Sequence, residues 1–247
     1  MGAVIAWLRL FRVANLPTVW SNVVMGVAVG AAATAALRPP GATPLAVLLN
    51  EAFVLLVAGT LMYAGAVAMN DGADAAVDLR ERPERPVPSG AISQKAALRA
   101  GKIGVVGGLA LTVLYPQPAV IALGTLLALS IVLYNALHLR FGWAAALPAV
   151  CRGLLVALAV AAVPHVGVLD ALVPAAVVAA AVLAVSLYAR AEADRPGRPS
   201  RVGWLLAGLP VLDAALCWLL AGNAGAAAFC LACALAAALA GRLLPGS

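Results

Sequence analysis

Apolar runs that match the thickness of a lipid bilayer constrain the fold of this chain more than any other feature. A helix of about 20 apolar residues crosses the hydrocarbon core and satisfies its backbone polar groups internally. Eight such runs lie at approximately 15–37, 47–69, 96–115, 118–138, 143–163, 168–189, 202–220 and 224–243. The sequence therefore predicts an all-α, polytopic membrane bundle of about eight transmembrane helices.

Charge and composition agree with a membrane protein. Apolar residues make up 64% of the chain and charged residues 11%, whereas a soluble domain has about 25% charged residues. In an eight-helix topology nearly all 16 Lys and Arg residues fall on the side of the two termini, and Arg38 falls on the other. Because cytoplasmic loops are enriched in Lys and Arg, we expect both termini, and the loops after the second and sixth predicted helices, in the cytoplasm of a bacterial or archaeal cell. The charge of +6 then reflects topology and anionic lipid, and nothing indicates nucleic-acid binding.

Two loops share a charge pattern. Acidic residues are followed by Arg-Pro-x-Arg-Pro at 82–86 and again, after Glu192 and Asp194, at 195–199. Each loop follows the second helix of a predicted four-helix set. The sequence thus predicts one membrane domain over 1–247, with pseudo-repeated halves of about 1–140 and 141–247 around a central cavity.

An acidic segment, residues 70–78, follows an uncharged apolar run. On an ideal helix with about 100° per residue, Asp74 lies about 60° and Asp78 about 20° from Asp71, and Asn70 borders this face. Three carboxylates this close need a cation between them, and ligands that are all oxygen favour Mg²⁺. We therefore predict Asp71, Asp74 and Asp78 as metal ligands supported by Asn70.

The arginines after this segment complement it. Mg²⁺ together with arginine forks neutralises a diphosphate, which assigns that role to Arg82 and Arg85. The neighbouring prolines stop the helix, so we expect this stretch to fold back over the site.

Three other interpretations fit part of this segment. An ordinary basic juxtamembrane loop accounts for Arg80 and Lys95, but not for three acids on one helical face. A transporter or lipid-handling protein that binds a cation or phosphate headgroup is the main alternative function. It predicts acids near the membrane midplane. A phosphatidyl-group transferase fits Asp71–Gly72 but not Ala75–Ala76.

The motifs resemble those of the UbiA superfamily of intramembrane prenyltransferases. The first family motif, Asn-Asp-x-x-Asp-x-x-x-Asp followed by Arg-x-x-Arg-Pro, is present in residues 70–86, and Pro88–Ser93 is similar to the chlorophyll-synthase and archaeal ether-lipid branch. An N-terminal Arg-x-x-Asn matches Arg12 and Asn15. Residues 134–153 also resemble EboC-like proteins, a bacterial branch of the superfamily.

The resemblance implies fold, reaction and site together. It implies a helical bundle around a lipid-accessible cavity, Mg²⁺, an isoprenyl diphosphate donor and an aromatic or lipid-precursor acceptor. Glu192 and Asp194 would complete the metal site. Substrate contacts are expected from the following residues: Asn70, Arg12, Asn15, His138, Arg140 and Arg195.

The chain departs from the family pattern in three places. Glu192 and Asp194 stand two residues apart instead of about four, which puts a second Mg²⁺ in question. His138 stands where the family has Lys after Tyr134, so His138 or Arg140 must supply that cation. We find eight helices, whereas the family commonly has nine.

Polar residues inside the predicted spans are candidate cavity groups, because a charge in a membrane helix faces an interior or a water-filled space. Arg152 is predicted either to contact a substrate phosphate or to pair with Asp213, and Asn22 points to the same region. The pairs Gly26/Gly30 and Gly104/Gly108 are interpreted as helix-packing positions.

Overall fold

The computed structural model describes residues 2–37, 44–193 and 201–243, and every regular element within them is helical. The α-helices are α1 (Ala3–Leu10), α2 (Leu16–Ala33), α3 (Pro44–Ala73), α4 (Ala75–Glu81), α5 (Gln94–Thr112), α6 (Pro118–Leu137), α7 (Leu147–Ala161), α8 (Val168–Ala193), α9 (Val202–Ala221) and α10 (Ala224–Leu243). Short 3₁₀ turns are η1 (Val13–Asn15), η2 (Ala35–Leu37) and η3 (Gly142–Ala146).

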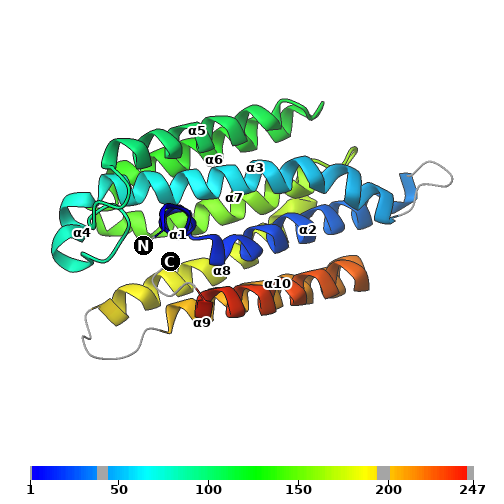
Figure 1. The fold of residues 1–247 in the computed structure, drawn as a ribbon. Coiled ribbons are helices and arrows are strands. Elements are labelled where there is room, and N and C mark those ends of the chain that lie inside the picture. Colours follow the sequence, from blue (N-terminus) through cyan, green and yellow to red (C-terminus); the bar gives the residue numbers. More distant parts are fainter. Residues whose placement is uncertain (1, 38–43, 194–200, 244–247) are drawn as a thin grey trace.

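Within the described residues, eight long helices run side by side along the bundle, near the positions predicted from the apolar runs (Figure 1). Both chain ends and α4 lie toward the same end of the molecule. In the described part of the chain, seven helices are long and apolar enough to cross a membrane, and α5 is not among them. Lys95, Arg99 and Lys102 are exposed in the first half of α5, and such side chains extend toward the polar interface while their stems stay in lipid. The chain is a multi-pass membrane protein.

Helix boundaries differ from the prediction by up to four residues, and two of these differences affect the site. Helix α3 continues to Ala73 instead of ending at 69, so Asn70 and Asp71 belong to it. The segment predicted at 143–163 begins as the 3₁₀ turn η3, and α7 starts at Leu147. Pro148 lies in the first turn of α7, where its missing N–H costs no hydrogen bond.

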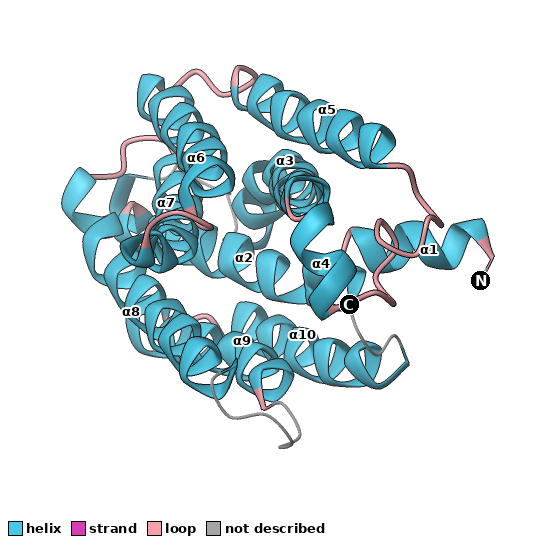
Figure 2. Ribbon diagram, turned by 90° about the vertical axis from the view of Figure 1, so that its left-hand side faces the viewer, coloured by secondary structure: helices cyan, strands magenta, loops and turns pink. Residues whose placement is uncertain are grey.

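Helix α2 occupies the centre of the bundle (Figure 2) and contacts α3, α7, α9 and α10. Its approach to α7 is close at two glycines. A Cβ atom on Gly26 would lie 3.0 Å from the carbonyl oxygen of Val156, and one on Gly30 would lie 2.8 Å from that of Val160. These positions pack helices, as predicted, since small residues let helix backbones approach in lipid.

The pair α3 and α5 packs in the same way. A Cβ atom on Gly104 would lie 2.7 Å from the carbonyl oxygen of Leu61 and 3.0 Å from the Cα of Gly65. The contact is therefore backbone against backbone, and it fixes α3, the helix that carries the acidic segment, against α5.

Gly104→Ala tests this contact. The added methyl group has no room, so we expect a loss of about 1–3 kcal/mol in the free energy of unfolding, measured by denaturation in detergent micelles. Gly107→Ala is the matched control on the same helix, because a Cβ there meets only a Leu61 methyl at 3.7 Å. It should be neutral or slightly stabilising, since Ala favours helix over Gly. Equal effects of the two substitutions would show that α3 and α5 are not held by this contact.

Candidate functional site

The acidic segment spans a break between two helices. Helix α3 ends at Ala73, Asp74 lies at the junction, and α4 begins at Ala75. The backbone N–H of Asp78 still donates to the carbonyl oxygen of Asp74 at 2.8 Å, so the helical path bends without unwinding. A Cβ atom on Gly72 would lie 2.8 Å from the side chain of Leu98, so this glycine lets α5 pack against the segment.

Asp71 and Asp78 share one cation, the guanidinium of Arg85. Arg85 Nη1 lies 2.7 Å from Asp78 Oδ2 and 3.6 Å from Asp71 Oδ1. Both aspartate side chains are 4% exposed, so the compensating charge is needed for burial. Arg85 reaches them because α4 ends at Glu81 and the following turns carry the chain back, as the prolines predict.

Arg12 pairs with Asp71 from the other side. Its Nη2 donates to Asp71 Oδ1 at 2.8 Å. Helix α1 positions this arginine by packing Ala6 and Leu10 into a small core with Ala68 of α3. Arg12 itself has a left-handed backbone, with φ of 45°, a conformation that costs a non-glycine residue about 1–3 kcal/mol. The ion pair with a buried carboxylate is the compensating interaction visible at this position.

Asp74 has different nearest partners from Asp71 and Asp78. His138, just beyond α6, places Nε2 2.8 Å from Asp74 Oδ1, and Asn70 Nδ2 donates to Asp74 Oδ2 at 3.1 Å. Burial raises the pKa of the Asp74 carboxyl, and the adjacent His138 opposes that rise. The break between α3 and α4 falls at Asp74 itself, beside these two partners.

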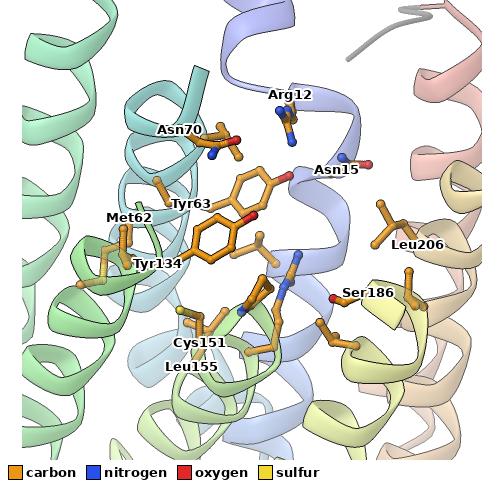
Figure 3. Close-up of a pocket in the computed structure, with 18 of the residues that line it drawn as sticks. Arg12, Asn15, Met62, Tyr63, Asn70, Tyr134, Cys151, Leu155, Ser186 and Leu206 are labelled. Atoms are coloured by element: carbon orange, nitrogen blue, oxygen red, sulfur yellow. The ribbon is translucent and has the colours of Figure 1, made fainter. Parts of the chain in front are cut away.

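A cavity of about 320 Å³ lies between α2, α3, α6, α7, α8 and α9. Arg12 and Asn70 lie at its polar end, Cys151 and Leu155 lie at the other, and the rings of Tyr63 and Tyr134 lie between them (Figure 3). Most of the remaining lining residues are apolar, with valine, leucine and isoleucine the most frequent. The acidic segment therefore adjoins one end of this largely apolar cavity through Asn70 and through Arg12, which pairs with Asp71.

The remaining predicted residues fall into three groups. Asn15 and Arg152 line the cavity, whereas Asn22 is buried behind it and bonds to Asp213 and Arg152. Arg82 is 51% exposed and 3.9 Å from Asp78, and Arg140 is exposed on the loop after α6. Asp194 and Arg195 lie outside the described residues.

Glu192, near the C-terminal end of α8, contacts the residue before α9. Its Oε1 accepts from the backbone N–H of Arg201 at 2.9 Å, which ties the end of α8 to the start of α9. Across the described part of the chain, no group of three or more His, Cys, Asp or Glu side chains is arranged to hold a metal ion. Between Asp71 and Asp78 the position between the carboxylates is taken by Arg85.

The sequence interpretation missed Tyr63 as a cavity residue. Tyr63 precedes Asn70 by seven positions on α3, which is about two helical turns and thus the same helix face. The seven-residue spacing between this aromatic residue and Asn70 could have indicated that Tyr63 lies near the site. The role of Thr18 as a hydrogen-bond partner of Arg152 was missed as well, because only the structure shows that contact.

Comparisons with known proteins show the family of this chain and a solved structure with a similar fold. The model of the UbiA prenyltransferase family matches residues 23–245. Digeranylgeranylglyceryl phosphate synthase of Methanoregula boonei is 41% identical over 116 residues, which cover 47% of this chain and 38% of that protein. A solved structure from work on digeranylgeranylglyceryl phosphate synthase in membranes has a TM-score of 0.62 and 17% identity, and the match covers 99% of this chain and 94% of that one. This last likeness concerns the fold alone.

Substitution of the two arginines tests the charge balance of the site. Arg85→Met leaves two buried carboxylates short of a cation, so the free energy of unfolding should fall by about 3–5 kcal/mol. Arg82→Met is the matched control, because this arginine is half exposed and 3.9 Å from Asp78, and exposed pairs contribute about 1 kcal/mol or less. Unfolding is followed in detergent without added metal or ligand. If the two variants lose stability equally, Arg85 is not the cation on which the buried aspartates depend.

Proposed function

The chain belongs to the UbiA prenyltransferase family, and from that premise we propose that it transfers an isoprenyl group from an isoprenyl diphosphate to an aromatic or lipid-precursor acceptor in the membrane. The observation that carries the proposal is the cluster of three aspartates and two arginines at the polar end of an apolar cavity. The match to the Methanoregula boonei synthase favours a lipid-type acceptor.

The residues at the polar end fit Mg²⁺ by their chemistry. All three acidic side chains offer carboxylate oxygens, the ligands that Mg²⁺ prefers. The position of Arg85 between Asp71 and Asp78 supports a demand for positive charge there. In the proposal Asp71, Asp74 and Asp78 hold the metal, which would neutralise charge on the departing diphosphate.

Arginine side chains then bind the donor. Arg12 lines the cavity, and Arg85 pairs with the same Asp71 that Arg12 contacts. Guanidinium groups bind phosphate oxygens through paired N–H donors. The bond between the allylic carbon and the diphosphate oxygen breaks, the oxygen keeps the electron pair, and charge stabilisation there lowers the barrier. In the proposal Arg82, which is 51% exposed, contacts the diphosphate from the solvent side.

The cavity wall protects the reactive carbon. Apolar side chains hold the isoprenyl chain and exclude water, which would otherwise capture the allylic cation. The rings of Tyr63 and Tyr134 lie between the polar and apolar ends, and the face of an aromatic ring attracts a cation. The acceptor atom forms the new carbon bond and loses its proton.

The activity test uses purified protein in lipid nanodiscs with geranyl, farnesyl and geranylgeranyl diphosphates, each with lipid-phosphate and aromatic acceptors. We expect diphosphate release that requires Mg²⁺ and disappears with EDTA. Asp71→Asn should reduce the rate by about 100-fold or more, the scale of removing one charge-stabilising group. Glu81→Gln is the matched control, because Glu81 is exposed on α4, and it should act like wild type. Absence of donor binding and of diphosphate release in wild type would refute the proposal.

A further inference from the structure

A second polar cluster lies inside the bundle, away from the three aspartates. Its members come from three helices: Thr18, Ser21 and Asn22 of α2, Arg152 of α7 and Asp213 of α9. A charged side chain within a membrane helix is costly unless it is paired or faces a polar space. The presence of charged side chains inside the bundle therefore needs an explanation. The hydrogen bonds of Arg152 suggest a functional one.

Arg152 is held by neutral acceptors along one side of its guanidinium. Nη1 donates to the carbonyl oxygen of Thr18 at 2.9 Å and to Asn22 Oδ1 at 2.8 Å, and Nη2 donates to Thr18 Oγ1 at 2.8 Å. These bonds use three of the five N–H groups of an arginine. The two remaining donors are Nε–H and the second N–H of Nη2. They project from one edge and form the fork that binds two oxygens of an oxyanion.

No carboxylate pairs directly with Arg152 among residues 2–37, 44–193 and 201–243, which corrects the predicted ion pair with Asp213. Asn22 bridges the two groups instead, since its Oδ1 accepts from Arg152 and its Nδ2 donates to Asp213 Oδ2 at 2.8 Å. Ser21 Oγ donates to the same Asp213 oxygen at 2.6 Å. Asp213 is fully buried and does not line the cavity, whereas Arg152 does.

The guanidinium also lies at a defined depth in the cavity. Its Cζ is 5.5 Å from the centre of the Tyr63 ring, which orients the planar group further. Tyr63 precedes Asn70 by seven residues on α3, a rise of roughly 10 Å along the helix axis. Arg152 thus faces the cavity at a level below the aspartates, where a donor diphosphate bound at the polar end would present its allylic carbon.

We infer that Arg152 binds an acidic group, a carboxylate or a phosphate, of the acceptor through its open Nε and Nη2 edge. Thr18, Asn22 and Tyr63 hold the guanidinium in place, and Asp213 anchors Asn22 from behind. The inference rests on the proposed prenyl transfer and narrows its acceptor to amphipathic acids. A neutral alcohol or hydrocarbon acceptor would leave a buried positive charge without a partner.

Binding of matched probes tests this inference without turnover. Dodecyl phosphate, laurate and dodecanol share a chain length and differ in the head group. Their affinities are measured in nanodiscs of neutral phosphatidylcholine, with and without Mg²⁺ and farnesyl thiodiphosphate, an unreactive donor analogue that occupies the polar end. Wild type with the analogue bound should prefer each acid to dodecanol by about 30-fold or more, the scale of a buried charged contact.

The variants separate the sources of any binding. Arg152→Gln should reduce the preference for the acids to about twofold while farnesyl thiodiphosphate still binds. Arg99→Gln, a change at an exposed arginine on α5, should retain the wild-type preference. Arg152→Lys keeps the charge but lacks the fork, so its preference should fall by about tenfold. If Arg152→Gln does not yield monodisperse protein, the preference measured for Arg152→Lys tests whether Arg152 binds the acids.

Three outcomes would overturn the inference: no preference for acids in wild type, an unchanged preference in Arg152→Gln or Arg152→Lys, or loss of donor-analogue binding in Arg152→Gln. The last outcome would place Arg152 on the donor diphosphate. Failure of wild type to bind the donor analogue is a separate result. It would count against the proposed transfer reaction, while the acid preference measured without analogue would still decide the role of Arg152.

Discussion

The pairing of Asp71 and Asp78 with Arg12 and Arg85 is the interaction on which the polar end of this bundle depends. The four residues belong to separate parts of the chain: the turn after α1, the end of α3, α4, and the loop that follows it. Two carboxylates this buried are unfavourable without cations. Their pairing therefore fixes the N-terminal segment and the returning loop around the end of the cavity.

The rest of the fold supplies an apolar space below that end. Small residues let α2 approach α7, and α5 approach α3, at backbone distance, so these pairs form rigid walls. The cavity lies beside these pairs, between α2, α3, α6, α7, α8 and α9, and its lining is mostly apolar. Polar chemistry is thereby confined to two levels, the aspartates with their arginines and, further in, Arg152 with its α2 partners.

The sequence predicted the features that depend on neighbouring residues, namely the helices and the turn that follows α4. Helices form wherever about 20 apolar residues run together, because lipid leaves the backbone no other partner, and the prolines after α4 return Arg85 to the acids. Contacts between distant residues were beyond such reasoning. The bend at Asp74 and its approach to His138 depend on how α6 ends beside α3. The bridge from Arg152 to Asp213 uses the amide of Asn22, and one sequence does not fix the rotation of three helices around it.

Arg85 would compete with a metal ion for the carboxylates of Asp71 and Asp78. The guanidinium nitrogen already lies between Asp71 and Asp78, so a metal ion that takes the same oxygens must displace it. In the proposed reaction a diphosphate offers the displaced arginine a new partner. Metal and donor would then each raise the affinity of the protein for the other, and by thermodynamic linkage the two factors are equal. The acidic end would be stable when empty and would take up its metal chiefly together with the molecule that the metal activates.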